Sequence, residues 1–391
     1  MNKPLSLKIL MPLLASILAL SPLAIDSYLP AMPQLATAFA TDISIVQNTL
    51  SIYLFGYAMG LIVFGPLADK VSRRLLVITG LSGFLLCSMA LILSQTIHQF
   101  FLFRFLQAFI CSAATVVVPG TIRALYGKNT AKGLSYVSMI MMLAPLAAPS
   151  IGSSLLLLGD WSIIFYALSG YALVVLIAAW RLLPEREQLL NTPSYSFVQR
   201  YRIVLGNQQA RLDLISSMTV SLAFFAYLTA IPFVYLTVYN VTKFQFSLLF
   251  GANVCALMTA HFINTRLVMR KGSRFMLRAG LVLAIVAVSA LVLVSSFQLP
   301  LVYIVLAIFP LMGSISMVAV NADALVLTEF ADHSGTATAV IGTLRFGIGA
   351  LAGPILAYFY NGNALPFALL MFIAIAIVVL CQLHIYRRQL L

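Results

Sequence analysis

The sequence predicts an all-α membrane protein with twelve transmembrane helices arranged as two halves of six. Three observations lead to this prediction. Of the 391 residues, 62% are hydrophobic and only 8% are charged, whereas soluble domains have about 45–50% and about 25%. The apolar residues form continuous blocks of about 20, the length of a spanning helix. The alternation of apolar and polar residues that a membrane β-barrel needs is missing. A soluble enzyme, a disordered chain and a secreted disulfide scaffold are therefore excluded.

The twelve apolar stretches follow one another with short connections, apart from one longer connection near the middle. Each is close to the length of roughly 20 residues that crosses the hydrocarbon core. We expect no cleavable leader, because the first apolar run continues well past the length of a signal-peptide core. The expected spans are residues 9–31, 44–67, 75–94, 99–122, 133–158, 161–183, 212–238, 245–268, 277–297, 300–328, 335–360 and 365–386.

Basic residues fall almost entirely on one side of this arrangement. With the N-terminus in the cytoplasm, 20 of the 23 Lys and Arg residues lie in inside segments, as the positive-inside rule requires. Lys243 lies outside, and Arg104 and Arg345 lie within spans. The net charge of +13 is therefore a topology signal that places both termini in the cytoplasm. No nucleic-acid partner is expected, because a continuous basic face with groove-reading elements is missing.

The longer connection divides the chain into residues 1–183, a cytoplasmic loop at 184–211 and residues 212–391. An internal repeat supports this division. The fifth span contains AlaProLeuAlaAlaPro at 144–149, and the eleventh contains GlyAlaLeuAlaGlyPro at 349–354, 205 residues later. Two parallel halves of six spans are typical of transporters whose substrate site lies near the midplane of the bilayer.

Motifs for cofactor and metal chemistry are missing. The four cysteines lie in apolar blocks without metal-ligand spacing, so we expect no metal and no cofactor. The nearest approach to a phosphate-binding loop, from Gly120 to Lys128, has the wrong spacing and lacks the following Ser or Thr. ATP-driven transport by this chain is therefore excluded, and no arrangement of residues indicates hydrolysis. The sequence predicts a protein that is not an enzyme.

Asp26 is the first of the charged residues within spans. A charge in the hydrocarbon costs several kcal/mol unless it is paired or faces water, so each such residue is a functional hypothesis. Asp26 lies between Pro22 and Pro30, and prolines leave backbone carbonyls of a helix without donors. Burial favours the neutral form of a carboxyl group, so Asp26 is a candidate to carry a proton and to contact substrate. The structural alternative is an ion pair or a helix cap.

Two arginines lie within spans. Arg104 and Gln107 stand one helical turn apart in the fourth span, and a fixed positive charge near Asp26 would favour its ionised form. The alternative is a structural arginine that bonds backbone carbonyls. Arg345 and Asp323 are expected to be neighbours, either as a self-satisfied ion pair or with Arg345 facing a cavity that takes an anionic substrate.

Aromatic and amide residues complete the candidate pocket, and a charged loop forms a candidate gate. Asp69, Arg73 and Arg74 lie at the membrane edge of the loop after the second span, where the carboxylate can have a partner in one conformation and lose it in the other. The alternative is solvated loop charge. The candidate pocket residues that have ordinary packing as their alternative are Tyr28, Tyr53, Tyr57, Phe224, Tyr227 and Asn253. Gln107 is also a candidate pocket residue.

Three motifs resemble those of a known family. GlyProLeuAlaAspLysValSerArgArg at 65–74 resembles the loop motif of the major facilitator superfamily. PheArgPheLeuGln at 103–107 resembles the fourth-span motif of that superfamily. AlaIleAspSerTyrLeuProAlaMetPro at 24–33 resembles the first-span signature of its Bcr/CflA drug:proton antiporter subgroup. The resemblance covers nearly the whole chain and implies the fold of that superfamily.

The resemblance also implies roles for particular residues. It places Asp26 in proton and substrate exchange, Arg104 in the proton-transfer machinery, and Pro145 and Pro149 in the antiporter motif of the fifth span, which takes part in gating. Three positions depart from the pattern. Ser72 stands where the loop motif usually has glycine, Ala144 replaces the first glycine of the antiporter motif, and Arg345 stands where an uncharged polar residue is expected.

The expected function is proton-coupled export of small organic molecules by alternating access. The expected partners are a small-molecule substrate, protons and the lipid bilayer, and the chain is expected to be a monomer in the bacterial inner membrane. One alternative is a dedicated exporter of an anionic metabolite, such as a carboxylate-type siderophore, for which Arg345 is the discriminating residue. Another is a membrane receptor or enzyme that does not transport.

Overall fold

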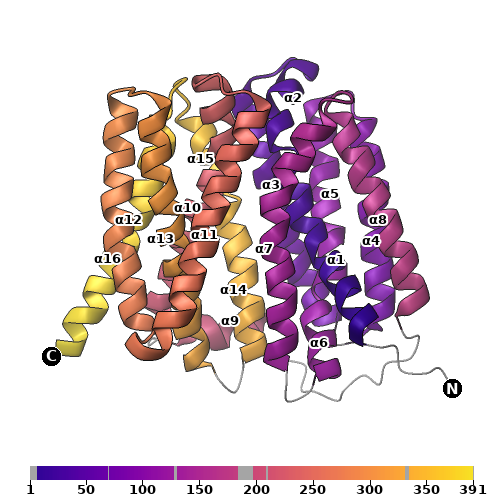
Figure 1. The fold of residues 1–391 in the computed structure, drawn as a ribbon. Coiled ribbons are helices and arrows are strands. Elements are labelled where there is room, and N and C mark those ends of the chain that lie inside the picture. Colours follow the sequence, from indigo (N-terminus) through magenta and orange to yellow (C-terminus); the bar gives the residue numbers. More distant parts are fainter. Residues whose placement is uncertain are drawn as a thin grey trace. The chain divides into compact units, whose positions relative to one another are not determined.

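A computed structural model describes residues 7–68, 70–126, 130–183, 197–207, 210–330 and 334–390. These ranges are helical throughout apart from short turns and contain no strand. The chain divides into two compact units, of which the first comprises Met1–Thr41 with Ile52–Ser196 and the second comprises Asp42–Ser51 with Phe197–Leu391. Figure 1 shows the long helices of each unit running side by side.

The first half of the chain contains eight α-helices and one short 3-10 helix within the described residues. In chain order they are α1 (Leu7–Asp26), η1 (Leu29–Ala31), α2 (Met32–Ala38), α3 (Ile43–Leu67), α4 (Arg73–Ile92), α5 (Ile97–Thr115), α6 (Val118–Tyr126), α7 (Thr130–Leu155) and α8 (Ser162–Leu182).

The second half begins with a short helix in the predicted connecting loop. The elements are α9 (Phe197–Gly206), α10 (Arg211–Pro232), the π-helix η3 (Phe233–Val238), α11 (Lys243–Lys271), α12 (Ser273–Ser296), α13 (Leu301–Glu329), α14 (Ser334–Gly349), α15 (Ala352–Tyr358) and α16 (Leu365–Leu390). Helix α9 packs through Val204 on a buried apolar cluster, which is formed by the start of α10, the end of α13 and the start of α14.

Eleven stretches of the described chain are long and apolar enough to cross a membrane. They coincide with the predicted spans, and α7, with 26 residues, occupies the place of the predicted fifth span. Large apolar side chains on the outer faces of these helices are exposed, as is expected of groups that contact lipid rather than water. Examples are Leu86, Val174, Val282, Leu306 and Leu380, each between 64% and 68% exposed. The prediction of an all-α, multi-pass membrane protein is confirmed.

Four spans that the sequence predicts as single helices are interrupted. Because proline lacks an N–H, it leaves the carbonyl four residues earlier without its helical donor. Pro30 does this at the break between α1 and η1, and Pro119 does it between α5 and α6. Pro232 lies at the change from α10 to η3, and Pro354 follows the break between α14 and α15. By length and hydropathy each of the four still counts as one membrane span, so the breaks lie within the predicted spans.

The interrupted helices are packed within each unit. In the first unit α1 packs on α7 and α8, and α4 packs on α5 and α8. In the second unit α10 packs on α13, α14 and α16, and α12 packs on α13 and α16. The breaks in the first, fourth and seventh spans therefore lie among neighbouring protein helices, where non-helical backbone is tolerated within a membrane.

Candidate functional site

Asp26 is the last residue of α1, directly before the break in the first span. Its side chain is buried, with 3% exposure, and its Oδ1 atom has no hydrogen-bond partner among the described residues. The next residue closes the helix, because the backbone N–H and the hydroxyl of Ser27 both donate to the carbonyl of Leu23, at 3.1 and 2.6 Å. Since Pro30 lacks an N–H, the carbonyl of Asp26 also has no donor from the following turn.

Arg104 of α5 is completely buried and is held by neutral groups. Its Nη1 donates to Oε1 of Gln107 at 2.9 Å, and its Nη2 donates to the carbonyl of Ala24 at 3.1 Å. The amide of Gln107 in turn donates to the hydroxyl of Ser88 on α4 at 2.8 Å. The guanidinium thus fixes the last turn of α1 to α5 through a backbone carbonyl, which is the structural alternative that the sequence left open.

Aromatic rings cover the guanidinium of Arg104. Its Cζ atom lies 4.1 Å from the ring centroid of Tyr28, 4.7 Å from that of Tyr53 and 5.7 Å from that of Phe165. A desolvated cation–π contact is worth about 2 kcal/mol, so the rings offset part of the cost of burying the charge. Arg104 forms no ion pair with Asp26 within 4.0 Å in the described part of the chain. The carboxylate is therefore not locked by the arginine.

Helix α3 brings two further predicted residues to this cluster. The hydroxyl of Tyr53 donates to the hydroxyl of Ser21 on α1 at 3.3 Å, and the hydroxyls of Tyr57 and Thr115 are 2.7 Å apart. Gly56, between the two tyrosines, permits this approach, because a Cβ atom there would lie 2.4 Å from the carbonyl oxygen of Phe105 on α5. Tyr28, Tyr53, Tyr57, Arg104 and Gln107, predicted separately from three spans, are thus brought together.

Helix α7 lies directly against the break in the first span. A Cβ atom on Gly152 would lie 1.8 Å from the carbonyl oxygen of Ser27 and 3.3 Å from Cγ of Pro30. The helix continues through Pro145, which is half-buried, and Pro149, which is buried. Glycine is therefore required at 152 for α7 to support the backbone next to Asp26.

The second unit contains its own charged group within spans. Arg345 of α14 and Asp323 of α13 form an ion pair through Nη2 and Oδ2, which is one of the two alternatives that the sequence left open. The hydroxyl of Ser217 on α10 donates to Oδ1 of Asp323 at 2.5 Å. The side chain of Arg345 is 33% exposed and that of Asp323 is 25% exposed. The ion pair is thus partly open, and the Nε atom of Arg345 has no hydrogen-bond partner among the described residues.

Three predicted pocket residues lie elsewhere in the second unit. The amide of Asn253 on α11 donates to the hydroxyl of Tyr227 on α10 at 2.9 Å, and both side chains are buried. The ring of Tyr227 stacks on Phe250 with a centroid distance of 5.9 Å. Phe224 is half-buried and meets Phe225 edge to face at 5.4 Å. These contacts are compatible with ordinary packing, and a role in substrate binding stays a prediction.

The predicted gate is described only in part, because Asp69 lies outside the described residues. The guanidinium of Arg74 donates to the carbonyl of Trp180 in the last turn of α8 at 2.6 Å. Arg73 begins α4, and Ser72, where the loop motif usually has glycine, accepts from the backbone N–H of Leu75 at 3.3 Å as the N-cap of that helix. This hydrogen bond gives the departure at Ser72 a structural reason.

Sequence reasoning missed a buried polar network in the second unit. Asp213 of α10, with 4% exposure, pairs with Arg274 of α12 through two hydrogen bonds of 2.5 and 2.8 Å. The amide of Gln382 on α16 donates to Asp213 and to the hydroxyl of Ser216, at 3.2 and 3.1 Å. The available signal was an acidic residue in the first turn of an otherwise apolar span. Such a residue is costly unless a group on a neighbouring helix pairs with it.

Comparison with known proteins identifies the family. The model of the Major Facilitator Superfamily matches residues 14–354. The chain is 28% identical to a bicyclomycin resistance protein homolog of Haemophilus influenzae, over 100% of this chain and 99% of that protein. It is 30% identical to a chloramphenicol resistance protein of Pseudomonas aeruginosa, over 87% and 84%. A structure of the xylose transporter XylE from E. coli shares the fold, with a TM-score of 0.72 at 15% identity over 97% and 96%.

These matches confirm the resemblance that the motifs indicated, including its drug-efflux subgroup, because the relatives are drug-resistance proteins. They also confirm that the protein is a secondary transporter and not an enzyme. Its multi-pass helices and bacterial relatives agree with a place in a bacterial membrane. On the family match over most of the chain, this protein belongs to the Major Facilitator Superfamily.

Proposed function

We propose that this protein exports small organic molecules from the bacterial cytoplasm by exchange for protons, through alternating access. The observation that carries the proposal is the carboxyl group of Asp26, which is 3% exposed, has a free Oδ1 atom and forms no ion pair within the described residues. The relatives named for resistance to bicyclomycin and chloramphenicol support an efflux role.

The proton-exchange step follows from the cost of an uncompensated buried carboxylate. An ionised carboxyl group in an apolar site is costly unless it is paired or hydrogen-bonded. Either a proton or a donor group of a substrate would remove that cost at Asp26. The two ligands would therefore compete for one group, and each would promote release of the other, as linkage requires.

Arg104 would set the environment of this exchange without closing it. Its contacts are to neutral oxygens and aromatic rings, so its positive charge stays fixed while Asp26 changes its protonation state. The rings of Tyr28 and Tyr53 lie on the guanidinium of Arg104. A substrate that contacts these rings would therefore also affect Arg104 and its surroundings. Tyr57 and Gln107 complete the proposed set of substrate contacts in the first unit.

The direction of transport rests on topology and linkage. The positive-inside distribution supports an inner-membrane protein with both termini in the cytoplasm. Protons would bind from the periplasmic side as substrate leaves, and would dissociate to the cytoplasm before the next substrate binds. Arg73, Arg74, Asp69, Pro145 and Pro149 would act in opening and closing this path.

Proton release from purified protein tests the proposal. Chloramphenicol and bicyclomycin are the probes, and wild type is compared with Asp26→Asn and with Asp42→Asn, which removes an exposed carboxylate. We expect release on ligand addition from wild type and Asp42→Asn, and none from Asp26→Asn. Equal release from all three proteins would remove Asp26 from the exchange. Confirmed binding without release from any of them would overturn proton coupling.

A second candidate function is export of an anionic metabolite, such as a carboxylate-type siderophore. It is favoured by the partial exposure of Arg345 and by its Nε atom, which has no partner in the described part of the chain. Transport by Arg345→Gln separates the candidates, because drug export should survive and anion export should be lost. The double variant Arg345→Gln/Asp323→Asn controls for the carboxylate that the single variant leaves unpaired.

A further inference from the structure

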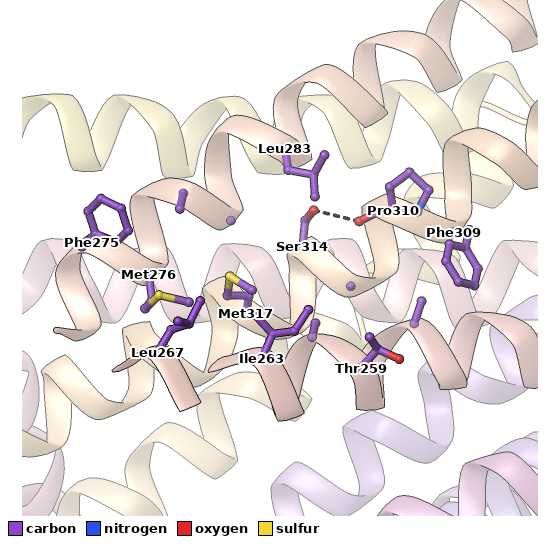
Figure 2. Close-up of a pocket in the computed structure, with 15 residues that line it drawn as sticks. Thr259, Ile263, Leu267, Phe275, Met276, Leu283, Phe309, Pro310, Ser314 and Met317 are labelled. Atoms are coloured by element: carbon purple, nitrogen blue, oxygen red, sulfur yellow. Dashed lines mark hydrogen bonds between the residues drawn. The ribbon is translucent and has the colours of Figure 1, made fainter. Parts of the chain in front are cut away.

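An elongated apolar groove lies in the second unit between α11, α12 and α13, with a volume of about 360 Å³. Figure 2 shows the side chains of the three helices converging on it. This volume lies within the range of roughly 300–1,000 Å³ typical of small-molecule sites. The larger lining side chains are Ile263, Leu267, Phe275, Leu283, Phe309 and Met317.

The groove offers no charged or orienting polar group along its wall. The hydroxyl of Ser314 is already used, because it donates to the carbonyl of Pro310 at 2.7 Å, the bond drawn in Figure 2. Thr259 carries the other hydroxyl on the wall. Phe275, Leu283 and Phe309 are 53%, 49% and 45% exposed, so the groove opens sideways. In a spanning bundle this opening faces hydrocarbon chains, which match such a wall.

Two cations stand at one end of the groove. On α11 the lining residues Ile263 and Leu267 recur at helical spacing, and Arg270 continues the same stripe three residues further on. The Nζ atom of Lys271 lies 5.6 Å from the ring centroid of Phe275, which itself lines the groove. Both cations are exposed, and they lie at the turn where α11 ends and α12 begins.

The neighbouring arginines are occupied differently. Arg274, on the other side of the turn, is committed to Asp213. Arg278 lies over the ring of Tyr386, and Arg266 lies over Phe262. Arg270 and Lys271 are therefore the cations of this turn that continue or contact the groove wall.

We propose that this groove holds one acyl chain of an anionic phospholipid, with the phosphate of its headgroup on Arg270 and Lys271. Helix α11 ends at Lys271, so the two cations stand at the end of a span, where lipid phosphates lie. Basic residues at this level attract anionic lipid. An apolar drug would fill the groove without using the cations, whereas a phospholipid uses both parts of the site.

Lipid binding to the full-length protein in detergent tests the proposal by native mass spectrometry. The probes are phosphatidylglycerol and phosphatidylcholine with identical acyl chains. We expect wild type to bind phosphatidylglycerol about tenfold more tightly, which corresponds to about 1.4 kcal/mol. The variant Arg270→Gln/Lys271→Gln should lose this preference, and Arg387→Gln/Arg388→Gln, which removes the same charge from the end of α16, should keep it.

Filling the groove provides an independent test. Ala279 lines the groove on α12 and is exposed, so Ala279→Phe should fit without disturbing the core and should weaken binding of both lipids. Val286→Phe, at an exposed position of the same helix outside the groove, should not. Equal binding of both lipids by wild type would overturn the headgroup site. Unchanged lipid binding by Ala279→Phe would overturn the acyl-chain site. The same holds if Ala279→Phe loses binding of chloramphenicol but keeps binding of both lipids.

Discussion

Each unit places an arginine within its spans, but the two arginines are neutralised in different ways. Arg104 in the first unit is completely buried and contacts neutral oxygens and aromatic rings. Arg345 in the second unit is one-third exposed and pairs with the carboxylate of Asp323. Among the described residues, the buried carboxyl group of Asp26 in the first unit has no ion pair, whereas the carboxylate of Asp323 in the second unit already has one.

This difference indicates where each unit can respond to a ligand. A carboxylate in an ion pair gains little from a proton, because protonation also leaves its partner unpaired. An unpaired buried carboxylate is stabilised by a proton or by any donor group that reaches it. We therefore propose proton exchange for the first unit, and either a structural role or recognition of anions for the pair in the second unit.

The largest expected effect comes from the contact that positions the site of the first unit. Gly152→Ala should destabilise the folded protein by about 3 kcal/mol or more, because its Cβ atom would lie 1.8 Å from a backbone oxygen that must move. Thermal unfolding in detergent measures the effect. Gly170→Ala, with no atom within 4 Å of the added Cβ, is the matched control and should be neutral or stabilising.

Removing Arg104 should cost more stability than removing Arg345. Arg104→Ala should cost about 2–4 kcal/mol, because it opens a cavity under three rings and leaves the Gln107 amide oxygen and the Ala24 carbonyl without donors. Arg345→Ala should cost about 1 kcal/mol, because its ion pair is partly exposed. Equal losses in unfolding midpoints of the two variants would contradict the proposed difference between the sites.

Neutralising the two carboxyl groups should affect stability differently. Asp323→Asn should lower stability by about 1 kcal/mol, since Arg345 loses its charged partner. Asp26→Asn should leave stability unchanged or raise it, since a buried carboxyl group with no ion pair among the described residues is replaced by a neutral amide of similar shape. Unfolding midpoints measured side by side decide the sign. A loss of stability in Asp26→Asn as large as in Asp323→Asn would show that Asp26 has a partner after all.

The smallest effect is expected at a single hydroxyl. Tyr53→Phe keeps the ring over Arg104 and removes the hydroxyl with its hydrogen bond to Ser21 and its contact with the thiol of Cys111, so it should cost about 0.5–1.5 kcal/mol. Tyr53→Leu, which also removes the cation–π contact at 4.7 Å, should cost more. The difference between the two variants in thermal unfolding isolates the contribution of the ring. No difference would mean that the ring does not stabilise the buried charge.

The comparison also shows which parts of the site could be found in the sequence. Asp26, Arg104 and Arg345 stood out because charges are rare and costly in apolar spans. The same cost made an Arg345–Asp323 ion pair one of the two alternatives for these residues. Asp213 carried the same signal and was passed over, although it holds a buried network with Arg274 and Gln382.

The helical class, the order of the spans and the family could be predicted from the sequence, because hydropathy over about 20 residues and short motifs depend only on neighbouring residues in the chain. The positions of the helix breaks near Val116 and Phe233 were not predicted. A carbonyl group that loses its N–H donor to a proline is tolerated at these places because neighbouring helices surround the backbone.

The tertiary structure alone decided what neutralises each charge. The carbonyl of Ala24 that accepts from Arg104 lies 80 residues away along the chain. The rings over the guanidinium come from the turn after α1, from α3 and from α8. Partners so distant in sequence leave no local pattern. They are selected when helices pack, because a buried charge or donor must find compensation among whatever groups the packing brings within reach.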